Sequence, residues 1–313
     1  MTQHTSSHEL ALIGYASGWG ARDSGCSEGP LFLKNHAFDR ALNRHGISAK
    51  WQSVIEPKIP YSKDIAKNYR TSDSRYDLVM DVLKRLTLQV ELACNHHKTP
   101  VVIGGDHSSA AATWSAITSQ MKAQEKFGLI WLDAHMDAHT PETRHEGKWG
   151  GHYHGQPLSA LLGEGEEPLP SLGSAGTKLS PEHVTLIGIR SFEPGEEVFV
   201  KRKGVKVYTM DDVRALGFDT CFKHALKRAT IGTAGYGISV DMDGFDPEFA
   251  PAVGTPEKDG LMADDVLNAF QSIRGDKSLK GLELVEFNPY NDEDSKTYDL
   301  MFRLLKTLYG EDS

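Results

Sequence analysis

The stretch LIWLDAHMDAHTP, residues Leu129 to Pro141, joins a short apolar run to alternating acidic and histidine residues. Its first half has the composition of a buried strand. If the backbone stays extended beyond that strand, Asp133, His135 and Asp137 lie on one side, because side chains alternate across a strand with period two. The pattern therefore predicts three metal-type ligands that converge at the end of a buried strand.

A single acidic or histidine residue after a strand is commonly a helix cap or a turn residue. That interpretation applies to each of these positions taken alone. Several carboxylates behind one apolar strand are harder to explain in this way, since neighbouring like charges are costly unless a cation offsets them. The cation hypothesis needs further ligands from elsewhere in the chain.

Predicted strands and helices alternate along the whole chain. The other predicted strands are Glu9–Gly14, Lys50–Ile55, Thr99–Ile103, His183–Gly188, Val205–Thr209, Tyr236–Val240 and Gly281–Phe287. Helical spacing is clear from Tyr76 to Asn95, and a helix is also predicted from Leu31 to His45. This alternation, without a break in composition, predicts a mostly parallel sheet covered on both faces, in one domain over residues 1–313.

Metal-type residues also follow three other predicted strands. They are His107 in the turn GGDHS, Asp241 and Asp243 after Tyr236–Val240, and Glu286 near the end of the last strand. Ligands of an open parallel sheet bind outside the carboxyl ends of its strands, so these residues are expected to meet at one edge. Four Asp and two His suit two divalent ions, with manganese favoured over zinc and magnesium also compatible. Glu286 is then a substrate contact.

Two ions that share a water lower its pKa and make hydroxide available at neutral pH. The predicted chemistry is therefore hydrolysis. A hypothesis from a different class is a non-catalytic metal-binding protein, for which a broken ligand set would be expected. All six ligands are present in this sequence, which favours the enzyme.

Composition and charge restrict the remaining function classes. The chain has 313 residues, of which 39% are hydrophobic and 25% charged, as in a soluble globular protein. Its formal net charge of -9 argues against nucleic-acid binding as the main function, because that needs a basic surface. No signal pattern and no apolar run of ~20 residues is present, which predicts a cytoplasmic protein without membrane spans. The three cysteines lack CxxC spacing and suggest neither a disulfide framework nor a thiolate zinc site.

Three motifs resemble the signatures of the ureohydrolases. They are GGDHS at Gly104–Ser108, DAHMD at Asp133–Asp137 and SVDMDGFDPEFAPAVGTPE at Ser239–Glu257. This family consists of manganese enzymes that include arginase, agmatinase, formiminoglutamase and guanidino-acid hydrolases. The resemblance extends from the first strand to the last helix. It implies a three-layer α/β/α fold around a parallel eight-stranded sheet, and a homo-oligomer that is a trimer or a hexamer.

The resemblance also implies two Mn2+ ions per chain and a division of the ligands between them. One ion would be held by His107, Asp133, Asp137 and Asp241, and the other by Asp133, His135, Asp241 and Asp243, with Asp133 and Asp241 bridging. Asp137 would pass a proton to the leaving amine. Glu286 would hold the guanidinium group of a small-molecule substrate by a charge-assisted bond.

Features around the motifs resemble arginase, whose reaction converts L-arginine to ornithine and urea. HGQP at His154–Pro157 is similar to the arginase segment in which the matching histidine is a proton shuttle. SFEPGE at Ser191–Glu196 is similar to a segment ending in DPGE, and places Glu193 where an Asp receives the substrate α-amino group. Thr255 also matches a substrate-binding position. These features favour arginine as the substrate.

The loop after DAHMD departs from the arginase pattern. Arginases usually place Asn and Ser there to hydrogen-bond the α-carboxylate, whereas the corresponding residues are His139, Gly150 and His152. His139 or His152 could bind a carboxylate in their place, and the alternative is that these histidines face solvent. The substrate therefore stays open between arginine and that of another member, an agmatinase, a guanidino-acid hydrolase or a formiminoglutamase. A zinc deacetylase shares the sheet but uses one zinc and fewer acids, which the second Asp pair argues against.

Overall fold

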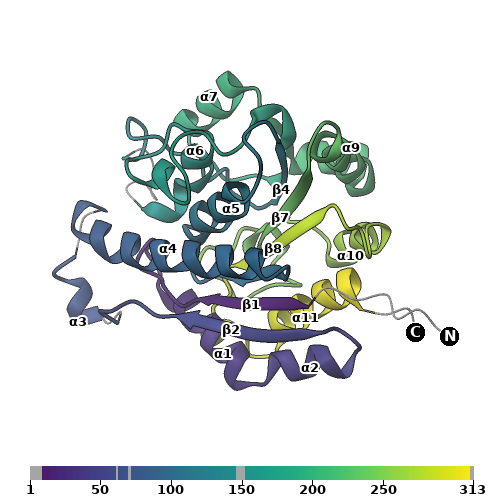
Figure 1. Ribbon diagram of the computed structural model, residues 1–313, viewed down its shortest axis with the longest axis horizontal. Helices are drawn as coiled ribbons and strands as arrows, with labels where there is room; N and C mark the ends of the chain where they lie inside the picture. Colours follow the sequence, from purple (N-terminus) through teal and green to yellow (C-terminus); the bar gives the residue numbers. More distant parts are fainter. Residues whose placement is uncertain (1–8, 61–62, 70–71, 146–151, 311–313) are drawn as a thin grey trace.

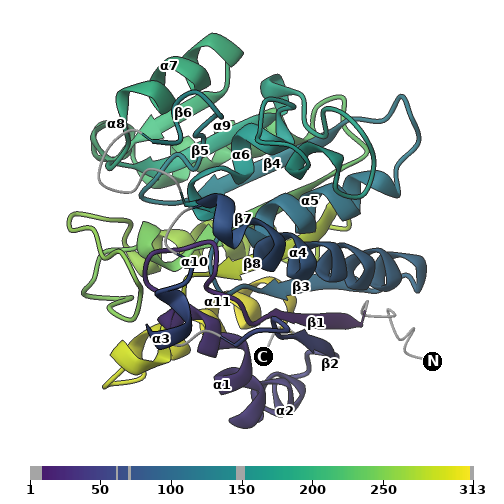
Figure 2. The same ribbon diagram turned by 90° about the vertical axis from the view of Figure 1, so that its left-hand side faces the viewer.

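The computed structural model describes residues 9–60, 63–69, 72–145 and 152–310, and its strands form one eight-stranded sheet. The strands are β1 (Leu10–Tyr15), β2 (Ala49–Ile55), β3 (Thr99–Ile103), β4 (Phe127–Leu132), β5 (Val184–Ile189), β6 (Lys206–Thr209), β7 (Gly235–Asp241) and β8 (Leu279–Val285). All pairings are parallel, in the order β2-β1-β3-β8-β7-β4-β5-β6. The strand labels follow this order from bottom to top in Figure 2. The predicted parallel eight-stranded sheet is confirmed.

Helices cover both faces of the sheet and complete the three layers. They are α1 (Gly29–Asn35), α2 (Phe38–Arg44), α3 (Lys63–Ala66), α4 (Ser72–Asn95), α5 (Ser109–Ser119), α6 (Pro157–Leu161), α7 (Pro194–Lys203), α8 (Met210–Leu216), α9 (Phe218–Thr230), α10 (Ala263–Ser272) and α11 (Lys296–Tyr309). Figure 1 shows α4 and α5 lying across the near face of the sheet. The three-layer arrangement therefore has the form that the sequence predicts.

Most strands contribute to two separate cores, one on each face of the sheet. In β1, Leu10 and Leu12 pack in the core formed with α1, α2, α9, α10 and α11. Ala11 and Ile13, which point the other way, pack with α4, α5 and α6. This two-sided burial explains why β1, β4 and β5 are almost uninterrupted apolar runs rather than alternating ones.

The predicted helix from Leu31 to His45 is instead two helices. Ala37 adopts a left-handed conformation with φ of 55°, which ends one helix and begins the next. In a continuous helix Leu33 and Phe38 would point about 140° apart. The break lets both side chains be fully buried in the same core, and their burial offsets the unfavourable backbone conformation of Ala37.

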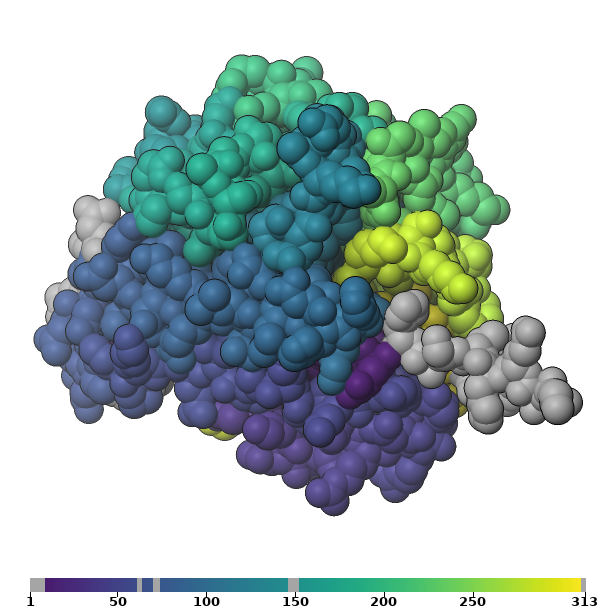
Figure 3. Space-filling model, in the orientation of Figure 1, coloured from purple at the N-terminus to yellow at the C-terminus, as the bar shows by residue number. Residues whose placement is uncertain are grey.

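Helices hide almost all of the sheet on the face seen in Figure 3, where the blue surface of α4 crosses the middle. Although α4 has 24 residues, charged side chains interrupt its apolar positions. None of the described helices combines the length and apolar character needed to cross a membrane.

Candidate active site

The six predicted metal ligands meet at the carboxyl ends of three strands. His107 follows β3, Asp241 ends β7, and the sheet order places β8 between these strands and β4 beside β7. Strand β4 ends at Leu132, so an extended continuation is not what brings the DAHMD side chains together. Asp137 instead has a left-handed backbone with φ of 50°. The convergence was predicted correctly, but a bent loop produces it.

His107 points into a group of three carboxylates. Its Nδ1 atom lies 3.2 Å from Asp133 Oδ2, 2.9 Å from Asp137 Oδ2 and 3.1 Å from Asp241 Oδ2. The imidazole is completely buried and stacks on Trp131, with 4.3 Å between ring centroids. Nδ1 makes no hydrogen bond of good geometry although no solvent reaches it. A buried nitrogen that faces three carboxylate oxygens is the arrangement expected of a metal ligand.

His135 forms a second group beside the first. Its Nδ1 atom lies 3.5 Å from Asp133 Oδ1 and 3.2 Å from Asp243 Oδ2. Asp133 thus directs one oxygen to each histidine. Asp241 contributes to both sides in a different way, because its second oxygen accepts a 2.8 Å hydrogen bond from the backbone N–H of Asp243. The two groups of possible ligands therefore share a carboxylate.

The electrostatics of the cluster favour positive charge at its centre. Burial alone would lower the pKa of His107, but the three carboxylates raise it well above its ordinary value. Burial and the nearby Asp133 raise the pKa of Asp137 to about 6. Burial, Asp243 and Asp133 raise the pKa of Asp241 well above its ordinary value. Cations placed among these oxygens would relieve the repulsion between the carboxylates.

Arg190, which directly follows β5, holds the turn that carries Asp243. Its guanidinium group donates to the backbone carbonyls of Asp243, Gly244 and Glu257, at 2.8 to 3.1 Å. Guanidinium has five N–H donors in one plane, so a single side chain can tie several carbonyls together. The position of Asp243 is therefore fixed by a contact made far along the chain.

Glu286 lies beyond the end of β8, beside the six predicted metal ligands, which together form the metal-type cluster. Its Oε1 atom accepts a 2.9 Å hydrogen bond from the His107 backbone N–H and lies 3.2 Å from His154 Nδ1. Burial alone would lower the pKa of His154, but Glu286 raises it above its ordinary value. The backbone of Glu286 is left-handed, with φ of 63°. Such unfavourable conformations in ordinary residues are concentrated at functional sites.

A second polar cluster contains His139 and Glu193 and lines the same cavity as His135, Asp137 and Asp243. The His139 Nε2 atom lies 3.4 Å from Glu193 Oε2 and 3.6 Å from Glu196 Oε2. Glu196 was not selected from the sequence, although it stands three residues after Glu193 in the pattern of a capping box at the start of α7. It also accepts a 3.0 Å hydrogen bond from the Ala138 N–H, which ties α7 to the loop after DAHMD.

Comparison with known proteins assigns the chain to a family. The model of the Arginase family matches residues 8–310. The chain belongs to the arginase family. It is 37% identical to the arginase of Bacillus caldovelox over 233 residues, covering 74% of this chain and 76% of that protein. It is 30% identical to the arginase of Brevibacillus brevis, covering 96% and 98%. The crystal structure of arginase from Bacillus cereus matches with a TM-score of 0.87 at 29% identity, covering 98% and 99%.

Membership of the arginase family confirms the resemblance to the ureohydrolases that the three motifs indicate. It also confirms the arginase-like fold and makes this chain a hydrolase of the ureohydrolase type. The substrate and the metal are finer questions, which depend on the residues around the cavity.

The cavity beside the metal-type cluster has a volume of about 30 Å3. It is lined by His135, Asp137, His139, His154, Gly155, Glu193, Glu196, Asp241, Asp243, Thr255 and Glu286. The Thr255 hydroxyl donates a 2.8 Å hydrogen bond to Asp243 Oδ2. His152 does not line this cavity; it is half-buried, with Nδ1 3.5 Å from Arg75 Nη1. Gly150 lies outside the described residues.

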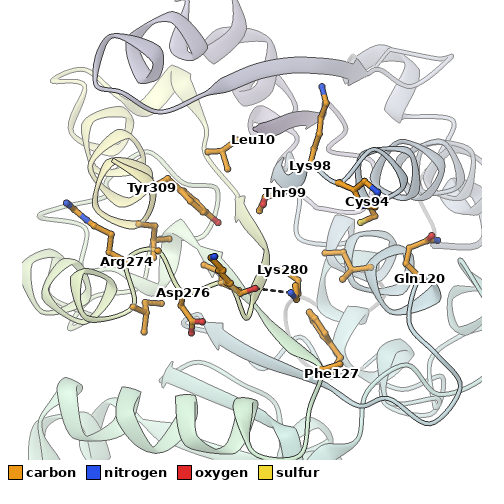
Figure 4. A pocket seen from close by; sticks show the side chains of 18 of the residues that line it. Leu10, Cys94, Lys98, Thr99, Gln120, Phe127, Arg274, Asp276, Lys280 and Tyr309 are labelled. Carbon is orange, nitrogen blue, oxygen red and sulfur yellow. Dashed lines mark hydrogen bonds between the residues drawn. The ribbon is translucent and has the colours of Figure 1, made fainter. Parts of the chain in front are cut away.

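A much larger cavity, of about 730 Å3, lies at the opposite edge of the sheet. Figure 4 shows its walls, which include Leu10, Thr99 and Phe127 at the beginnings of β1, β3 and β4. None of the candidate ligands lines it. Because ligands of open parallel sheets bind at the carboxyl ends of the strands, the smaller cavity is the active-site candidate.

His152 should make the stability of the protein depend on pH. Burial, with the positive charges of His154 and Arg75, lowers the pKa of His152 to about 4 from an ordinary value of 6.5. The unfolded chain therefore binds a proton at His152 at higher pH than the folded protein does. His152 leaves the free energy of unfolding unaffected above pH 6.5 and lowers it as pH falls from 6.5 towards 4. We expect His152→Gln to reduce the loss of unfolding free energy between pH 7.5 and 5 by ~1–2 kcal/mol, after discounting for solvent screening. Urea unfolding at the two pH values measures this; equal losses in the two proteins would contradict it.

Proposed function

We propose that this chain is a binuclear manganese hydrolase that cleaves the guanidinium group of L-arginine to give ornithine and urea. The observation that carries the proposal is the pair of neighbouring ligand groups, His107–Asp133–Asp137 and Asp133–His135–Asp243, that share Asp133. A shared carboxylate with a histidine on either side is suited to two ions held close together. The substrate is a small guanidino molecule rather than a nucleic acid.

The donor set fits two Mn2+ ions per chain. Imidazole nitrogens and carboxylate oxygens without any thiolate suit a hard-to-borderline divalent ion. The buried Nδ1 atom of His107, which has no hydrogen bond of good geometry, agrees with a ligand role. One ion would be held by His107, Asp133, Asp137 and Asp241, and the other by Asp133, His135, Asp241 and Asp243. When bound, the ions would supply a hydroxide nucleophile near neutral pH.

The remaining residues would orient the guanidinium group and move protons. Glu286 is buried and accepts hydrogen bonds, so its carboxylate would hold the guanidinium by a charge-assisted contact. Asp137, with a pKa raised to about 6 by burial and Asp133, would carry a proton to the leaving amine. The His154 side chain is 14% exposed and lies beside Glu286, so it would transfer protons between cavity and solvent.

The far end of the substrate would meet His139 and Glu193. For arginine, the α-amino group would contact Glu193, with Thr255 also on the cavity wall, and His139 or His152 would contact the α-carboxylate. One observation favours a second candidate. His139 directs Nε2 at two carboxylates, so this end of the cavity is suited to a cationic group and offers few donors to a carboxylate. A guanidino substrate that ends in an amine alone, such as agmatine, would fit this arrangement.

A substrate panel distinguishes these candidates. We expect the manganese-loaded protein to release urea from arginine faster than from agmatine or guanidinobutyrate, and to release little formamide from formiminoglutamate. Faster urea release from agmatine would support the second candidate instead. The control is the same protein after treatment with a chelator, which should release neither product. No urea from any guanidino compound would contradict the proposal.

Metal analysis separates the enzyme from a non-catalytic binding or regulatory protein of the same fold, in which the metal-ligand set would be broken. Two manganese ions per chain after incubation support the enzyme, whereas none supports the alternative. We also propose that the protein is cytoplasmic and forms a trimer or hexamer, as the family resemblance implies.

A further inference from the structure

A buried carboxylate lies beneath the metal-type cluster, in the middle of the sheet. Glu283 on β8 has no exposed surface, and burial raises the pKa of its side chain. Its Oε1 atom accepts hydrogen bonds from the hydroxyls of Ser109, at 2.8 Å, and Thr113, at 2.7 Å. Its Oε2 atom accepts one from the Ser239 hydroxyl at 3.0 Å. Burying such a group is costly unless it is hydrogen-bonded in this way.

Ser239 connects this carboxylate to His107. The Ser239 Oγ atom lies 2.9 Å from His107 Nε2, on the opposite side of the ring from the nitrogen that faces the three carboxylates. A hydroxyl group has a single proton to donate, and an ionised carboxylate can only accept. Because the Ser239 proton is directed to Glu283, Ser239 must accept the hydrogen of His107 Nε2. The Nδ1 atom is then left with its lone pair directed at the metal-type cluster.

We propose that Glu283, acting through Ser239, is a positioning residue that keeps His107 in the tautomer that binds metal. This inference rests on the proposed metal site. Ser109 and Thr113, both on α5, fix the other oxygen of Glu283 and so give the carboxylate one orientation. Partners of this kind set the tautomer and direction of metal-binding histidines, and their loss typically reduces metal affinity about 10- to 100-fold.

Glu283→Gln tests the direction of these hydrogen bonds without changing side-chain size. Ser109 and Thr113 both donate, so the amide oxygen should face them and the amide NH2 should face Ser239. Ser239 would then donate its proton to His107 Nε2, which moves the ring proton to Nδ1. We expect the affinity for Mn2+ to fall about 10- to 100-fold.

The experiment is a titration of the full-length protein with Mn2+, in which free Mn2+ is followed by electron paramagnetic resonance. Wild type is compared with Glu283→Gln, Ser239→Ala and the double variant. The matched control is Thr185→Val, a buried isosteric change on β5 whose hydroxyl has no hydrogen-bond partner. Ser239→Ala removes the link and should weaken Mn2+ binding less than Glu283→Gln does. The double variant should bind Mn2+ as Ser239→Ala does, and therefore more tightly than Glu283→Gln.

Each outcome has a definite meaning. Wild-type affinity in Glu283→Gln would overturn the inference, and so would a double variant that binds as weakly as Glu283→Gln, because packing alone would then explain the loss. If Glu283→Gln does not fold by circular dichroism, Ser239→Ala must still weaken Mn2+ binding relative to Thr185→Val, and equal affinities would overturn the inference. Wild type that binds no Mn2+ would overturn the proposed function as well, which the wild-type titration alone reveals.

Discussion

Asp241→Ala is expected to remove both metal ions and nearly all activity. Asp241 directs one oxygen at His107 Nδ1, 3.1 Å away, and uses the other to fix the backbone of Asp243. Alanine therefore removes a ligand from the first group and loosens the second. We expect the loss of this ligand to reduce kcat/KM roughly 10³-fold, which at ~1.4 kcal/mol for each tenfold change corresponds to about 4 kcal/mol of transition-state stabilisation.

Urea release and metal content, measured on the same preparation, check this prediction. Asp133→Ala should behave similarly, because Asp133 faces both His107 and His135. The control is Asp264→Ala, which removes the same charge from a side chain that is 82% exposed. Full activity in either of the first two variants would show that the assigned bridging role is wrong. Loss of activity in the control would point to a general effect of charge.

The place of the metal-type cluster could be predicted because it depends only on the ends of strands. Apolar runs identify β3, β4 and β7, and the acids and histidines follow each run directly. Parallel strands bring their carboxyl ends to one edge, so His107, Asp133 and Asp241 had to lie at that edge whatever the exact strand order, and the order β3-β8-β7-β4 places them close together along it. The conformations of the loops after these strands do not follow from the positions of the strand ends.

The loop conformations that aim the side chains could not be predicted from periodicity. Asp137 and Glu286 both have left-handed backbones, which ordinary residues rarely adopt. Tertiary contacts impose these conformations: the Asp137 carbonyl accepts from the Leu158 N–H, and the Glu286 N–H donates to the Gly105 carbonyl. Neither partner is adjacent in sequence, so an extended continuation of β4 was the natural but incorrect expectation.

Residues that act through others were missed because their partners are far along the chain. Glu283 accepts from Ser109, 174 residues away, only because β8 lies beside β3 in the sheet. The sequence does contain a signal, since an acid within the apolar run of β8 is unusual for a strand buried on both faces. Without the strand order, however, nothing links that acid to His107.

Glu286→Gln is expected to reduce kcat/KM strongly while leaving both metal ions bound. Gln has the same shape and can still accept the hydrogen bond from the His107 N–H. What it loses is the negative charge that would hold the guanidinium group. Truncating one partner of a buried charged pair costs about 2–5 kcal/mol, so we expect a decrease of roughly 10²- to 10³-fold. Steady-state urea release and metal analysis measure the two quantities.

The pH dependence separates substrate binding from a structural effect of Glu286→Gln. Glu286 raises the pKa of His154, so the pKa of that histidine should fall in the variant, and any limb of the rate profile due to His154 should move to lower pH.

The control is Glu257→Gln, the same change in a side chain 3.9 Å from His135 Nε2 and 35% exposed. Glu and Gln carry the same left-handed backbone at residue 286, so thermal stability should be unchanged where His154 is neutral and should fall only at lower pH, where protonated His154 lacks its charged partner. Loss of metal with wild-type kcat/KM per bound ion would assign Glu286 to the metal cluster and not to the substrate.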